Sequence, residues 1–336
     1  MRQRRFRAAA GLALAAAFAS AGCAVNPALR VAEALPPTVE GAAAPQPLLL
    51  DGVPFHPQTE YHCGPAALAG VLGASGVPAE RADPDALAPQ VYLPGRKGSL
   101  QLELVGATRR AGRIPYEIER TPEALLAELA AGRPVLVLQN LLTRTVPRWH
   151  YAVLVGADPA RNRLVLNSGT RERLPVGAPS FLRTWDWAGR WGLLALRPGE
   201  LPARAEPARY LAAVADFEAV AGADAAAPAY RAALERWPRE PRAHLALGNQ
   251  AHAAGDPAAA ARHYREGLRH APADPVLGNN YASVLGELGC RDKARAAIGA
   301  ALAASPADGH WRPQLEATAA EIEAARSRAG PACGEF

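Results

Sequence analysis

The sequence is poor in the residues that build metal centres and disulfide frameworks. Its 336 residues contain four cysteines, eight histidines and one methionine, and these residues show no zinc-ligand spacing. Long apolar runs are absent as well. The one apolar stretch, near the N-terminus, is too short and too weakly apolar for a membrane-spanning helix. We therefore expect no metal, no other cofactor and no transmembrane helix.

Acidic residues are missing before Cys23, whereas four arginines precede it. A basic start followed by a short apolar run and small residues is typical of a signal peptide, here residues 1–22. The segment ASAGC is similar to a lipobox, with Ser20 where leucine is usual, and it predicts lipidation of Cys23. A simple secretory signal cut near Ala21 is the alternative. A lipid would hold the protein at a membrane surface, and Ala24 resembles a signal for the outer membrane, facing the periplasm.

Little net charge remains once the signal peptide is removed. The full chain carries +5, and subtracting the four arginines leaves +1, which gives no electrostatic case for nucleic-acid binding. The length allows about two domains, and 49% apolar residues suffice for globular cores. Residues 23–47 are rich in alanine and proline and are interpreted as a tether.

The most informative stretch is QTEYHCGPAALAGVL, residues 58–72. The Ala-rich run after Cys63 predicts a helix, and Pro65 suits its first position. Cys63 would then lie at the helix N-terminus, where backbone N–H groups and the helix dipole favour a thiolate. We therefore expect Cys63 to be a nucleophile. The side chain of Gln58 and the backbone N–H of Cys63 would form an oxyanion hole.

A cysteine nucleophile requires a base and a group that orients the base. The segment WHYAVLVGAD predicts a strand that begins near His150, and RLVLNSG predicts a second strand that ends near Asn167. A turn at 158–161 would make an antiparallel hairpin in which the two side chains are diagonal neighbours on one face. His150 would be the base and Asn167 its orienting partner. Asp158, in the turn, is the alternative partner.

These residues resemble the double-glycine peptidase family, papain-like cysteine peptidases that cut bacteriocin leader peptides, and especially its stand-alone lipid-anchored relatives. The matching pieces are Gln58, CGPAAL from Cys63, HYAVLVG from His150, and Asn167. In the family, the third member of the catalytic triad is more often Asp, followed by Pro, where this chain has Asn167. The family's exporters also place the glutamine one residue further from the cysteine. The resemblance implies an α+β papain-like domain at 48–200 that cleaves peptide or protein substrates.

The last third of the chain repeats with a period of 34 residues. Leu247-Gly248 falls where the first helix of such a unit requires it. This pattern is similar to tetratricopeptide repeats and predicts an all-α domain at 207–329, ending in a capping helix, whose concave surface binds a partner protein. The aligned columns are Ala226, Ala260 and Ala294; Tyr230, Tyr264 and Ile298; Ala233, Gly267 and Ala301; and Pro238, Pro272 and Pro306.

Two cysteines remain for structure in an oxidising compartment. Cys290 and Cys333 would form a disulfide that ties the C-terminal tail to the last repeat; two free thiols are the alternative. The sequence thus predicts a lipid-anchored envelope cysteine peptidase. A catalytically silent binding protein, or a cell-wall amidase or transferase with the same Cys-His pair, are the alternatives. Cell-wall cysteine hydrolases usually show Asp-Cys-Ser-Gly where this chain has His-Cys-Gly-Pro.

Overall fold

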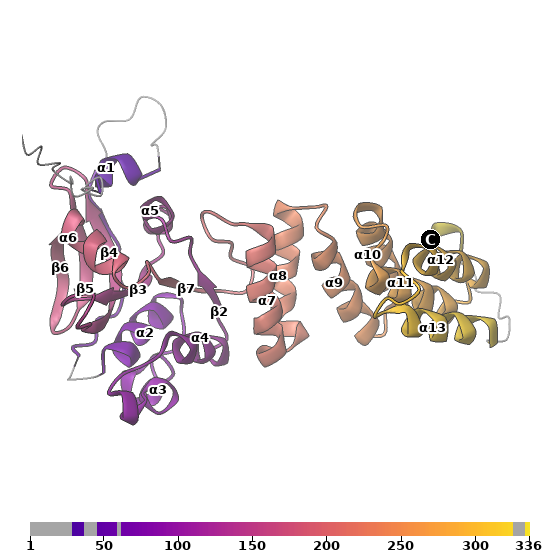
Figure 1. Cartoon of the computed structure of the whole chain (residues 1–336), viewed down its shortest axis with the longest axis horizontal. Helices are drawn as coiled ribbons and strands as arrows, with labels where there is room; N and C mark the ends of the chain where they lie inside the picture. The colour runs from indigo at the N-terminus through magenta and orange to yellow at the C-terminus, as the bar shows by residue number, and fades with distance from the viewer. Residues whose placement is uncertain (1–28, 37–45, 59–61, 325–332) are drawn as a thin grey trace, which may run out of the picture.

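The structure is a computed structural model that describes residues 29–36, 46–58, 62–324 and 333–336. The predicted signal peptide and the predicted lipidation site, Cys23, lie outside these residues. The prediction of a tether at 23–47 is wrong for residues 29–36, which include a short helix and bury Leu29, Val31 and Ala34 in the core. The molecule is elongated, with a sheet and its flanking helices at one end and paired helices continuing to the other (Figure 1). Within the described ranges, no helix combines the length and the apolar character needed to cross a membrane.

The first half of the chain is built on one antiparallel sheet. Its strands are β1 (Leu48–Leu49), β2 (Ile114–Glu117), β3 (Val135–Asn140), β4 (Trp149–Asp158), β5 (Arg163–Ser168), β6 (Arg171–Gly177) and β7 (Gly192–Leu196). They follow the order β2-β7-β3-β4-β5-β6, and β1 pairs with β4. β4 therefore lies inside the sheet, with β3 and β5 on its two sides.

Helices cover both faces of this sheet. They are α1 (Val31–Ala34), α2 (Cys63–Ala74), α3 (Pro84–Val91), α4 (Gln101–Arg110), α5 (Pro122–Ala130) and α6 (Ala178–Asp186), with a 3-10 turn η1 (Pro94–Arg96). Because strand side chains alternate, Leu136 packs with α2, α3 and α4, whereas Val137 packs with α5 and α6. The predicted α+β plan of this part is confirmed.

The second half consists of helices in antiparallel pairs. They are α7 (Pro207–Ala221), α8 (Ala223–Arg236), α9 (Pro241–Ala253), α10 (Pro257–His270), α11 (Pro275–Glu287), α12 (Arg291–Ala304) and α13 (Arg312–Ala324), followed by a 3-10 turn η2 (Cys333–Glu335). The first helix of each pair begins with proline at 207, 241 and 275, a spacing of 34 residues. Each start is capped by the preceding acid, Glu206, Glu240 or Asp274, which accepts backbone N–H bonds.

Small residues allow these helices to pack closely against one another. A Cβ on Gly248 would lie 2.4 Å from the Tyr264 ring, and a Cβ on Gly278 would lie 2.7 Å from that of Ala301. The aromatic ring and the methyl group thus fill space that a larger residue would need. Two residues of the aligned columns, Tyr264 and Ala301, therefore mark helix contacts against these glycines.

The apolar core continues from the sheet into the paired helices. Tyr210, Val214 and Phe217 of α7 are buried in the same cluster as Tyr116 of β2 and Leu125 of α5. The connection between the halves is fixed as well. The buried carboxylate of Glu128 accepts hydrogen bonds from Arg133 and from the backbone N–H of Ala203, both at 2.7 Å. The first helix pair is therefore packed on the sheet-containing half.

The C-terminal tail is tied to the last helices. Cys290 and Cys333 are joined by a disulfide across 43 residues of sequence, and Cys290 is buried. This is the pairing that the sequence predicts.

Candidate active site

Cys63 is the first residue of α2, with His62 as its N-cap. Pro65 occupies the third position of the helix instead of the first. It fits there because the first four N–H groups of a helix have no partner within it. The helix is buried from Gly64 to Leu72, so packing against the sheet holds its N-terminus. The half-buried Cys63 therefore has a fixed position.

The thiol of Cys63 is held in its neutral form. Backbone N–H groups of Tyr151, Gly64 and Cys63 act to lower its pKa, but the larger effect is burial, which raises it above the usual value. The sequence-based expectation of a resting thiolate is therefore wrong. The helix N-terminus supplies the expected N–H groups, yet their effect is smaller than the cost of removing a charged sulfur from water.

His150 lies near the start of β4, opposite Gln139 of β3. Burial and the neighbouring positive charge of Arg148 lower the pKa of its imidazole to about 4. The ring is therefore neutral at pH 7 and able to accept a proton. Its Nε2 is 2.8 Å from the hydroxyl oxygen of Ser168 at the end of β5. This hydrogen bond fixes the ring through Nε2 and leaves Nδ1 for a reacting group.

Asn167 does not make the predicted contact with the imidazole of His150. Its Oδ1 accepts a hydrogen bond from the backbone N–H of Arg173, at 3.0 Å, and its side chain is buried. The reason is a β-bulge in β4, between Leu154 and Gly156. Asn167 pairs with Val153 and so faces the side opposite His150, because a one-residue shift reverses the face of every later side chain. Ser168, the next residue, takes the place beside the ring.

Asp158, the alternative partner, is also placed away from the imidazole. Its carboxylate accepts hydrogen bonds from the backbone and the guanidinium of Arg161, each at 3.0 Å, at the far end of the hairpin. These bonds hold its pKa below the usual range. Asp158 therefore closes the turn.

A cavity of about 980 Å³ brings three of the predicted residues together. Gln58, Cys63 and His150 all line it. The backbone N–H of Gln58 donates to the carbonyl of Gly169, at 3.0 Å, which ties the segment before α2 to the turn after Ser168. This bond holds Gln58 at the cavity edge, on the same cavity as Cys63.

Ser99, in the loop before α4, also lines this cavity. Its hydroxyl is buried and has no hydrogen-bond partner within the described ranges. A Cβ on Gly64 would lie 2.3 Å from that oxygen, so the hydroxyl lies against the residue that follows Cys63. The loop carries no motif that would have predicted this placement, because it depends on contacts between distant segments.

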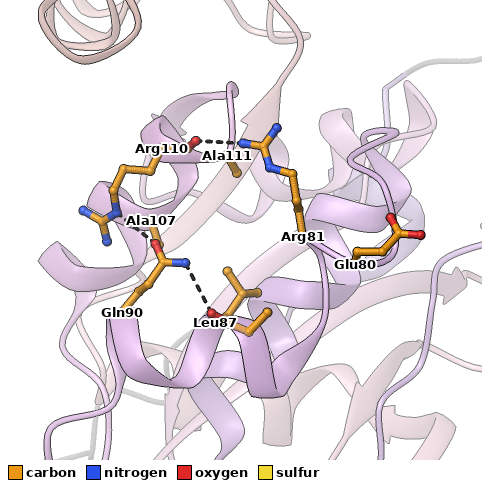
Figure 2. Close-up of a pocket in the computed structure, with 8 residues that line it drawn as sticks. Glu80, Arg81, Leu87, Gln90, Ala107, Arg110 and Ala111 are labelled. Carbon is orange, nitrogen blue, oxygen red and sulfur yellow. Dashed lines mark hydrogen bonds between the residues drawn. The ribbon is translucent and has the colours of Figure 1, made fainter.

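A smaller hollow of about 200 Å³ lies between α3 and α4 (Figure 2). Its polar side chains bond to one another: Arg81 donates to the carbonyl of Arg110, whose guanidinium donates to Gln90. No cysteine, serine or histidine lines it. Among the described residues, this hollow therefore shows no nucleophile beside a histidine, whereas the Cys63 cavity does.

No protein-family model and no curated protein matches the chain. Among solved structures, the chain is similar to a candidate C39-like peptidase from Bacillus anthracis, with 17% sequence identity and a TM-score of 0.37. The superposition covers 44% of this chain and 96% of that one. A likeness of this size leaves the function to be argued from the site itself.

Proposed function

We propose that the chain is a cysteine peptidase in which Cys63 is the nucleophile and His150 the general base. The observation that carries this proposal is the cavity itself. A cysteine at the N-terminus of a buried helix opens onto the same space as a neutral imidazole held by Ser168. This combination of nucleophile, base and orienting group is the one that nucleophilic catalysis requires.

The reaction starts from the neutral pair. As the sulfur of Cys63 bonds to the substrate carbonyl carbon, its proton passes to Nδ1 of His150, and the carbonyl oxygen becomes an oxyanion. The amide of Gln58 and the backbone N–H of Cys63 stabilise that oxyanion. His150 then gives the proton to the leaving amine, which leaves a thioester. A water molecule, deprotonated by His150, attacks the thioester and releases the acid and the thiol.

The proposal for the whole chain adds an anchor and a recruitment surface. A lipid on Cys23 would hold the mature protein at the outer membrane, facing the periplasm. The paired helices would be tetratricopeptide repeats that recruit a substrate or partner protein. The 34-residue spacing of their starts supports this reading.

Labelling with a peptide that carries a thiol-directed electrophile tests the proposal. The mature protein should be modified at Cys63, and peptides from the envelope should accumulate uncut in a Cys63→Ala strain. A His150→Gln variant should fold, lose turnover and label slowly. His252→Gln, on the exposed surface of α9, is the matched control and should behave as the wild type. Full turnover by His150→Gln would reject the proposed peptidase mechanism and favour the alternative of a binding protein.

A further inference from the structure

Two loops form the walls of the Cys63 cavity. One is the segment around η1, closed by a bridge between Leu93 and Gly98. The other joins β3 to β4 and is held by Asn140, which is almost fully buried. Its Oδ1 accepts the backbone N–H of Leu142 and that of Arg148, and its Nδ2 donates to the carbonyl of Thr143. The cavity walls are therefore built features with internal hydrogen bonds.

Positive charge is concentrated on these walls. Arg96, Lys97 and Arg148 line the cavity, and no carboxylate lines it within the described part of the chain. The guanidinium groups of Arg96 and Arg148 make no ion pair with any described residue. Other arginines of the same half do pair, as Arg173 does with Asp51 and Arg190 with Asp186. Because the mature chain carries a net charge of only about +1, this concentration is local.

The same walls expose apolar side chains. Trp149 is 55% exposed and Leu100 42%, and both line the cavity. Leu142 and Val146 are 52% and 60% exposed on the loop between β3 and β4. Large apolar side chains gathered beside a cavity indicate a binding surface. A ligand for this surface would carry negative charge and apolar groups together.

We propose that the cavity binds an extended peptide in which acidic side chains alternate with or adjoin apolar ones, with a carboxylate against Arg148 or Arg96. This inference rests on the proposed function, which places a peptide bond at Cys63. A peptide fits better than a nucleic acid or a membrane. Nucleic-acid binding uses a basic stripe along many phosphates, whereas here Arg96 and Arg148 line a single cavity. A flat membrane surface would not enter a cavity that Cys63 lines.

Binding is measured without turnover, in a mature Cys63→Ala variant. The probe is a fluorescent dodecapeptide with two glutamates and two leucines, compared by anisotropy with versions that carry glutamine or lysine instead of glutamate. The glutamate peptide should bind roughly 10-fold more tightly than the glutamine peptide, since charge-assisted hydrogen bonds exceed neutral ones. The advantage should shrink in 0.5 M salt, because the site is partly open to solvent.

Variants of Arg148 and Arg96 test whether these side chains cause the preference for glutamate. Arg148→Gln and Arg96→Gln should each reduce the preference for glutamate by roughly 3- to 10-fold, and the double variant should abolish it. Arg236→Gln, which removes the same charge from an exposed position at the end of α8, is the control and should change nothing. Equal affinity for the three peptides, or a glutamate preference that survives the double variant, would overturn the inference. So would tighter binding to anionic vesicles or to single-stranded DNA than to the peptide.

These outcomes are separable from the test of the enzyme. If the electrophile labels Cys63 while the peptides bind equally, the peptidase proposal stands and the acidic-peptide inference fails. If the glutamate peptide is preferred but Cys63 neither labels nor turns over, the cavity is a peptide-binding site and the peptidase proposal fails.

Discussion

Replacing Ser168 with alanine removes the hydrogen bond that holds Nε2 of His150. The bond matters most in the transition state, when the imidazole carries a positive charge. Hydrogen bonds to charged groups contribute about 1.5–3 kcal/mol, and each 1.36 kcal/mol corresponds to a tenfold change in rate. We therefore expect Ser168→Ala to lower kcat/KM by roughly 10- to 150-fold, with little change in thermal stability.

The matched variant is Asn167→Ala, one residue earlier. It removes the bond to the backbone N–H of Arg173, which costs about 0.5–1.5 kcal/mol of stability. Its kcat/KM should fall less than that of Ser168→Ala, because Asn167 does not touch the ring. Ser168→Asp should recover activity and raise the pKa of His150, since a carboxylate stabilises the imidazolium.

The assay is cleavage of one fluorogenic peptide at pH 7, with the melting temperature measured separately for each variant. A silent Ser168→Ala, or an Asn167→Ala variant that keeps its melting temperature and loses more activity, would refute the reasoning. Either result would mean that the β4–β5 hairpin has the regular register that the sequence suggests, without the bulge.

Three further predictions follow from the structure. With the pKa of His150 near 4, kcat/KM at pH 5 should stay within twofold of its value at pH 7. If the imidazole had its ordinary pKa, kcat/KM would fall roughly 30-fold between pH 7 and pH 5. A fall of that size in a pH-rate profile would reject the buried neutral base. Gly64→Ala should lower the melting temperature and reduce activity at least roughly 10-fold, because the added Cβ would lie 2.3 Å from the Ser99 hydroxyl; the control Gly95→Ala, with open space around it, should be neutral in both assays. Cys333→Ser should cost about 2–4 kcal/mol in urea unfolding monitored at the last helices, since it opens a 43-residue loop, and unchanged unfolding would show that the tail is held by packing alone.

The sequence predicted the parts of the site that depend on local pattern. The Ala-rich run after Cys63 and the alternating strand after His150 each occupy a few consecutive residues, and both elements form as predicted. The 34-residue spacing likewise predicted where the paired helices begin. These features depend on neighbours along the chain, so their signals are strong.

The parts that depend on register and burial could not be predicted. Whether Asn167 or Ser168 faces His150 is decided by one extra residue in β4, Val155. Gly156, which follows it, is compatible with a bulge, but a lone glycine in a strand does not fix the register. The ionisation state of Cys63 depends on how deeply other segments bury it, which a motif does not encode. The placement of Ser99 has the same origin, because the wall loop reaches α2 only after the chain has folded.

The last prediction concerns the effect of the charged cavity walls on the pKa of His150. Arg148 lowers the pKa of His150 through its charge, in addition to burial. Ser168 contacts the ring, and Cys63, Arg96 and Lys97 line the same cavity. No described carboxylate lines the cavity to offset these cations, so a bound glutamate beside Arg148 would raise the pKa of His150.

The pH dependences of kcat/KM and kcat distinguish His150 in the free enzyme from His150 beside a bound peptide. This is because kcat/KM reports the free enzyme and kcat reports the enzyme–substrate complex. For an acidic peptide, the acid limb of kcat should lie at higher pH than that of kcat/KM. For the matched glutamine peptide, the two limbs should coincide. In Arg148→Gln, the limb of kcat/KM should itself move to higher pH, because the repelling charge is gone, and the gap between the limbs of the acidic peptide should close. A gap of equal size for both peptides would mean that the shift comes from desolvation by any bound substrate, and the charge of the walls would then affect binding alone.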